Sequence, residues 1–123
     1  MPPQVFLDLG QAFLSDGDTG SAERTFAMAR NLADPRGYQR EVASIFEKGD
    51  KIPESLTRYE KLLRTSPSDV ALIARVAKLN EKEGKDDIAF RFYQRGLNLL
   101  LLQTPLTTQE ESKQVQYLSL IHI

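Results

Sequence analysis

The chain has 123 residues, one histidine, no cysteine and a formal net charge of −1. These numbers exclude disulfides, a zinc site built from several histidines, and an overall field that would draw the chain to nucleic acid. Hydrophobic residues make up 41% of the sequence, which is enough to bury a core. The N-terminus lacks a signal-peptide pattern, and the leucine run at 99–102 is far shorter than the ~20 apolar residues of a membrane span. The sequence therefore predicts a soluble, cytoplasmic protein with no membrane contact.

Apolar residues recur three and four positions apart along almost the whole chain. This is helical periodicity, and no segment shows the sustained alternation of a strand. Glycines, which allow tight turns, and prolines, which cannot continue a helix, separate the periodic runs. The sequence predicts an all-α fold with helices near 4–15, 20–33, 37–48, 53–65, 69–83, 86–103 and 108–120.

Several positions recur with one period of about 34 residues, which indicates duplication of a helix pair. Three independent sets of residues show this spacing: Phe26, Tyr59 and Tyr93; Ala22, Ser55 and Ala89; Phe13, Phe46 and Asn80. A second group of equivalent positions holds small residues, which would let two paired helices approach closely: Gly10, Ala43 and Ala77.

The repeated unit resembles the tetratricopeptide repeat, whose pattern is Trp-x2-Leu-Gly-x2-Tyr, then Ala-x3-Phe, then Pro. The first unit matches as Phe6-x2-Leu9-Gly10-x2-Phe13, Ala22-x3-Phe26 and Pro35. The second is weaker, with Gln39-x2-Val42-Ala43-x2-Phe46, Ser55-x3-Tyr59 and Pro67. The third reads Ile73-x2-Val76-Ala77-x2-Asn80 and Ala89-x3-Tyr93, but has Leu101 where proline is expected.

The resemblance covers about 3–103 and implies a right-handed superhelical solenoid of antiparallel helix pairs. The three pairs would span about 3–35, 36–69 and 70–103, within a repeat region of 1–106. A capping helix and tail would occupy 107–123, as solenoids usually end in a polar cap. The last five residues, 119–123, resemble a translated sequencing adapter, and no function is assigned to them.

In the resembled fold the first helix of each pair lines a concave groove, so exposed residues there are candidates for partner binding. By register the candidates are Gln11, Arg40, Ser44, Lys48, Arg75, Lys78 and Lys82. Cations outnumber acids in the inner half of the second and third units, which favours a protein or peptide partner with acidic side chains or a C-terminal carboxylate. The alternative reading of the same residues is a solvated helix face.

The string Asp18-Thr19-Gly20-Ser21 is the one that carries the catalytic aspartate of aspartic proteases. Such an aspartate lies on a loop held by strands and faces a second copy. Here helical runs flank the string, so it is interpreted as the turn inside the first helix pair, with Thr19 or Ser21 capping the helix that follows.

The sequence contains no other arrangement typical of catalysis, and no catalytic, cofactor-binding or metal-binding residue is predicted. The expected function is a non-catalytic protein-interaction module or scaffold, without cofactor and without nucleic acid. The alternative is a structural fragment of a longer solenoid, or a unit that forms homo-oligomers through its leucine-rich C-terminal helices.

Overall fold

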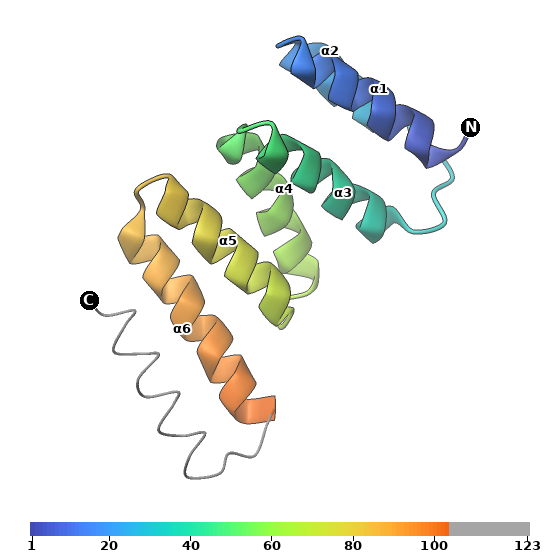
Figure 1. The fold of residues 1–123 in the computed structure, drawn as a ribbon. Helices are drawn as coiled ribbons and strands as arrows, with labels where there is room; N and C mark the ends of the chain where they lie inside the picture. The colour runs from blue at the N-terminus through green and yellow to red at the C-terminus, as the bar shows by residue number, and fades with distance from the viewer. Residues whose placement is uncertain (104–123) are drawn as a thin grey trace. The chain divides into compact units, whose positions relative to one another are not determined.

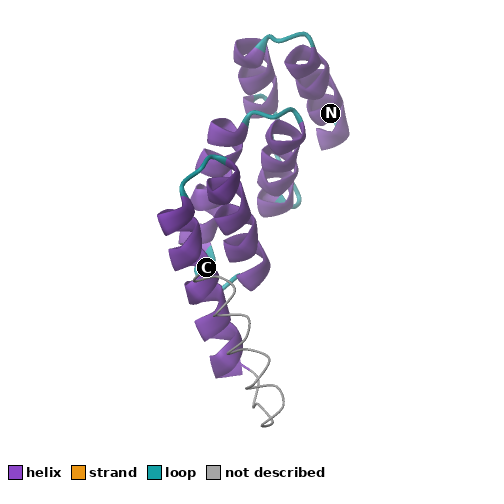
Figure 2. Cartoon of the chain, turned by 60° about the vertical axis from the view of Figure 1, so that its left-hand side comes forward, coloured by secondary structure: helices purple, strands orange, loops and turns teal. Residues whose placement is uncertain are grey.

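The computed structural model describes residues 1–103. Over this range the chain is all-α, with six helices and no strand, joined by short loops (Figures 1 and 2). In chain order they are α1 (Pro3–Ser15), α2 (Thr19–Ala27), α3 (Pro35–Lys48), α4 (Ile52–Thr65), α5 (Val70–Lys82) and α6 (Asp86–Gln103). No helix within 1–103 is long and apolar enough to cross a membrane. The helix predicted over 108–120, and with it the cap at 107–123, lies outside the described residues.

The chain divides into two compact units, Met1–Leu62 and Leu63–Ile123, and the boundary falls near the end of α4. In the first, α1 packs against α2 and α3 around a core that includes Leu7, Phe26 and Phe46. In the second, α5 packs against α6, and Gly96 of α6 approaches Ile73 of α5 so closely that an added Cβ would lie 3.4 Å from its side chain. The predicted division into three helix pairs stays a prediction.

Five of the six described helices begin and end within about two residues of the predicted bounds. The exception is the helix predicted over 20–33, because α2 ends at Ala27. The Arg30 guanidinium donates to the carbonyl of Ala27, and Asn31 has a φ of 53°, which a continuing α-helix cannot contain. Leu32 packs against the core of the first unit from this loop. The prediction of a longer second helix was therefore wrong, because tertiary packing outweighs local helix propensity here.

One turn geometry occurs three times along the chain. In each copy an amide N–H donates over 2.9 Å to the carbonyl of the residue five positions earlier, at the end of α1, α3 and α5. This is the long hydrogen bond of a Schellman motif, which closes a helix with a left-handed residue. The donor and acceptor pairs are Asp18 and Phe13, Lys51 and Phe46, and Lys85 and Asn80. Each pair lies one period of the sequence repeat after the pair before it.

The left-handed residue of this turn is a glycine in two copies and an aspartate in the third. Gly17 has a φ of 81°, Asp50 of 59° and Gly84 of 77°. A left-handed conformation brings Cβ close to the following carbonyl, and only glycine avoids this cost. Asp50 therefore carries strain that its two counterparts lack.

Replacing Asp50 with glycine is expected to raise the free energy of unfolding by up to about 1 kcal/mol, because it removes the Cβ from a left-handed residue. Chemical denaturation of the purified chain measures the change. As a control, Gly17→Ala introduces the same strain at the equivalent position and should lower stability by about 1 kcal/mol. A glycine variant less stable than the parent chain would contradict this assignment of strain.

A tyrosine-to-glutamate hydrogen bond also recurs, once in each unit. The Tyr59 hydroxyl donates to Glu47 Oε1 over 3.1 Å, and the Tyr93 hydroxyl donates to Glu81 Oε2 over 3.1 Å. The second donor and the second acceptor each lie one repeat period after the first, as the successive copies of the turn do. The same contact thus links α4 to α3 and α6 to α5.

Candidate partner-binding site

The string Asp18-Thr19-Gly20-Ser21 forms the N-terminal cap of α2. One carboxylate oxygen of Asp18 accepts from the Ser21 backbone N–H over 3.0 Å, and the other accepts from the Ser21 hydroxyl over 2.7 Å. These bonds, with the Arg24 charge as a smaller cause, hold the pKa of Asp18 below its usual range. The prediction that Thr19 or Ser21 caps the helix was wrong, because the residue before the first helical turn, Asp18, supplies the acceptor.

Three of the candidate groove residues form one line along α3. Arg40, Ser44 and Lys48 are four positions apart, so they share one side of the helix. Arg40 and Lys48 are exposed, and Ser44 is half-buried. The opposite side of α3 carries the buried Tyr38 and Phe46. The fourth candidate of this unit, Gln11, is exposed on α1.

The remaining three candidates form a similar line on α5. Arg75, Lys78 and Lys82 follow one another at spacings of three and four, and all three are exposed. Leu72 and Val76 on the other side of the helix are buried. The line therefore lies on the part of α5 that the core does not use, and it carries three positive charges.

The candidate residues belong to two separate units. Gln11 and the line on α3 lie in Met1–Leu62, and the line on α5 lies in Leu63–Ile123. The candidate side chains on α1, α3 and α5 are exposed, except that of Ser44, which is half-buried. A single groove that contains both lines stays a prediction.

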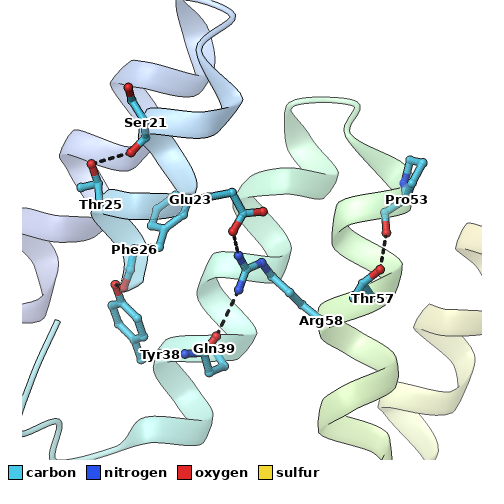
Figure 3. A network of polar contacts seen from close by, with 9 residues as sticks. All are labelled: Ser21, Glu23, Thr25, Phe26, Tyr38, Gln39, Pro53, Thr57 and Arg58. Carbon is cyan, nitrogen blue, oxygen red and sulfur yellow. Dashed lines mark hydrogen bonds and ion pairs between the residues drawn. The ribbon is translucent and has the colours of Figure 1, made fainter. Parts of the chain in front are cut away.

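Arg58 of α4 is the centre of a polar network that sequence reasoning missed (Figure 3). Its guanidinium forms an ion pair with Glu23 of α2, donates to Gln39 Oε1 of α3 over 3.4 Å, and lies 5.0 Å above the ring centroid of Phe46. A cation over an aromatic face is attracted by the ring quadrupole. The network joins three helices of the first unit, and no local sequence pattern around Arg58 predicts these contacts.

Two further hydrogen bonds in the first unit satisfy backbone carbonyls with buried hydroxyls. Tyr38 of α3 donates to the Phe26 carbonyl over 2.6 Å (Figure 3), and Ser55 of α4 donates to the Ala43 carbonyl over 2.9 Å. Burial raises the pKa of Tyr38, and the nearby Arg58 charge partly opposes that rise. The phenol is therefore protonated at neutral pH. These hydrogen bonds hold helices of the first unit together.

Metal-binding geometry does not occur in the described part of the chain. Within 1–103 no three His, Cys, Asp or Glu side chains come together in a way that could hold a cation. No model of a known protein family and no curated protein matches the chain.

Proposed function

We propose that the chain is a tetratricopeptide-like repeat protein that binds a segment of another protein, without catalysis. In this proposal the three helix pairs stack into a right-handed solenoid, and the first helices α1, α3 and α5 line its concave side. The partner segment, extended or helical, lies along that side. The chain then serves as a scaffold or interaction module.

The repetition of the same contacts at one period is the observation that carries the proposal. The Schellman turn occurs three times and the tyrosine-to-glutamate bond twice, and both follow the period of the sequence repeat. Contacts that repeat at one period are expected when each helix pair is a copy of one unit, and stacked copies are how such units bury their apolar faces.

The charge on the exposed lines supports an acidic partner. Arg40 and Lys48 on α3 and the three cations on α5 are presented on the sides of these helices that the cores leave outside. Lysine and arginine bind carboxylates through charge-assisted hydrogen bonds. A segment with Asp, Glu or its own C-terminal carboxylate fits this surface better than a neutral or basic one.

Reversing two charges on α5 is expected to weaken binding of an acidic segment by at least about tenfold, because two attractive pairs become repulsive. The probe is an array of short peptides rich in Asp and Glu, with free and amidated C-termini, followed by titration of the best binder against Arg75→Glu/Lys78→Glu. The melting temperature of this variant is measured beside that of the parent chain, so that a loss of affinity is not confused with a loss of fold.

The matched control is Lys61→Glu/Arg64→Glu on α4. It reverses two exposed charges at the same spacing of three, but on a second helix of a pair, and it should leave the affinity within about twofold of the parent value. An affinity unchanged in the α5 variant, or reduced equally in both variants, would reject the groove.

A second candidate function is self-association through the C-terminal end. Leu100, Leu101 and Leu102 at the end of α6 are exposed, and such apolar groups favour burial against another surface. A size that grows with protein concentration would favour this function, whereas a monomer that binds the acidic peptide would favour the groove.

A further inference from the structure

The first helix, α1, is apolar on a side that its own unit leaves exposed. Leu9 is 50% exposed and Phe13 is 38% exposed. With their neighbours at helical spacing they form the α1 outer face, defined as Val5, Phe6, Leu9, Ala12 and Phe13. Polar residues occupy another side of the helix, at Gln4, Asp8, Gln11 and Ser15. The remaining side of α1 is buried and carries Leu7, Gly10 and Leu14.

The equivalent residues are buried in the two later copies of this helix. Val42 and Phe46, which correspond to Leu9 and Phe13, are 1% and 0% exposed. In α5 the corresponding Val76 and Asn80 are also buried. In α3 the residues Val42 and Phe46 are buried in the core of the first unit, whereas in α1 their counterparts are exposed.

In the first unit, residues of both α1 and α2 contact α3. The ring of Phe26, on the second helix of the preceding pair, meets the ring of Phe46 edge to face, with centroids 5.5 Å apart. Tyr38 of the covered helix also bonds to the carbonyl of Phe26. A surface that fits the α1 outer face is thus the side of a second helix on which the Phe26 position lies.

The last described helix, α6, has such a side. Tyr93 holds the position equivalent to Phe26, and Leu101 lies eight positions later, near the same side of the helix. With 18 residues α6 is longer than α4, which has 14, and the added length carries the exposed leucines at its C-terminal end.

We infer that the α1 outer face of one copy packs on α6 of a second copy, in the way that Phe46 of α3 meets Phe26 of α2 inside the chain. The inference deepens the second candidate function by naming the surface that the C-terminal leucines meet, and it does not depend on the groove. Because the two surfaces differ, the contact is heterologous and adds copies head to tail.

The test is the mass of the 123-residue chain in solution at concentrations from about 1 μM to about 1 mM, measured by sedimentation velocity. The parent chain should grow beyond a dimer as its concentration rises. Leu9→Glu and Leu101→Glu should each weaken association by at least about tenfold, because a charge enters an apolar contact. The matched control Gln11→Glu adds the same charge on the polar side of α1 and should associate like the parent.

Mixing the two variants gives the decisive result. Leu9→Glu keeps an intact α6, and Leu101→Glu keeps an intact α1 outer face, so an equimolar mixture should form a one-to-one dimer and grow no further. Unfolding curves of each variant, close to that of the parent, show that the fold is retained.

Three outcomes would overturn the inference. They are a parent chain that stays monomeric throughout, a Leu101→Glu variant that still associates like the parent, and a mixture that fails to form the dimer. The second outcome indicates pairing of two α1 helices instead. Titration of the Leu9→Glu variant with the acidic peptide tests the groove separately. The groove proposal and the self-association proposal can therefore fail independently.

Discussion

Tyr59→Ala is expected to lower the free energy of unfolding by about 3–5 kcal/mol, the cost of truncating a core aromatic. The Tyr59 side chain on α4 is buried, and its hydroxyl donates to Glu47 of α3. Removing it leaves a cavity and takes away one of the hydrogen bonds that join α4 to α3. Urea denaturation followed by circular dichroism measures the loss.

Two other variants separate the contributions to this loss. Tyr59→Phe keeps the ring and removes only the hydroxyl, so it should cost about 1 kcal/mol. Lys61→Ala changes an exposed residue of the same helix and should stay within about 0.5 kcal/mol of the parent. If Tyr59→Ala were no more damaging than Lys61→Ala, the repeat alignment that places Tyr59 in the core would be wrong.

Gly10→Ala is expected to destabilise the first unit by about 1–3 kcal/mol, because an added methyl group overpacks the contact between α1 and α2. A Cβ on Gly10 would lie 2.2 Å from the nearest atom of the Phe26 ring, well inside van der Waals contact. The ring cannot simply move away, since it also packs edge to face against Phe46. Thermal melting of the variant measures the effect.

The same substitution at Gly20 should have the opposite sign. A Cβ there would come no closer than 3.5 Å to any neighbour, and alanine reduces the conformational entropy of the unfolded chain, which stabilises by about 0.4–1 kcal/mol. A smaller side chain at position 26 should also relieve the clash, so Gly10→Ala with Phe26→Leu should cost less than the two single changes together. Additive costs would show that the methyl group does not strike Phe26.

The bounds of most helices could be predicted because their signals are local. Pro35 begins α3, Gly84 adopts the left-handed conformation after α5, and apolar spacing identifies the buried side of each helix. Each signal acts within a few residues of the chain. The interpretation of Asp18-Thr19-Gly20-Ser21 as a turn and helix start depended on its flanking residues in the same way.

Contacts between distant residues could not be predicted from such signals. Glu23 and Arg58 lie on different helices, far apart along the chain, and nothing near either residue in the sequence points to the other. The early end of α2 could not be predicted for the same reason. Leu32 packs against the core although the local sequence favours a longer helix. The candidate groove was derived from register alone, and it needs the placement of one unit against the other, which register does not supply.

The sequence by itself determined that the described chain is helical, where most of its helices begin and end, and which positions recur from one helix pair to the next. Only the tertiary structure decided that Asp50 takes the left-handed position of its turn, that Arg58 joins three helices, and that Leu9 and Phe13 stay exposed while their counterparts Val42 and Phe46 are buried. The reason is physical: backbone propensity and apolar spacing act over one or two helical turns, whereas burial of a given face depends on whether another helix lies against it.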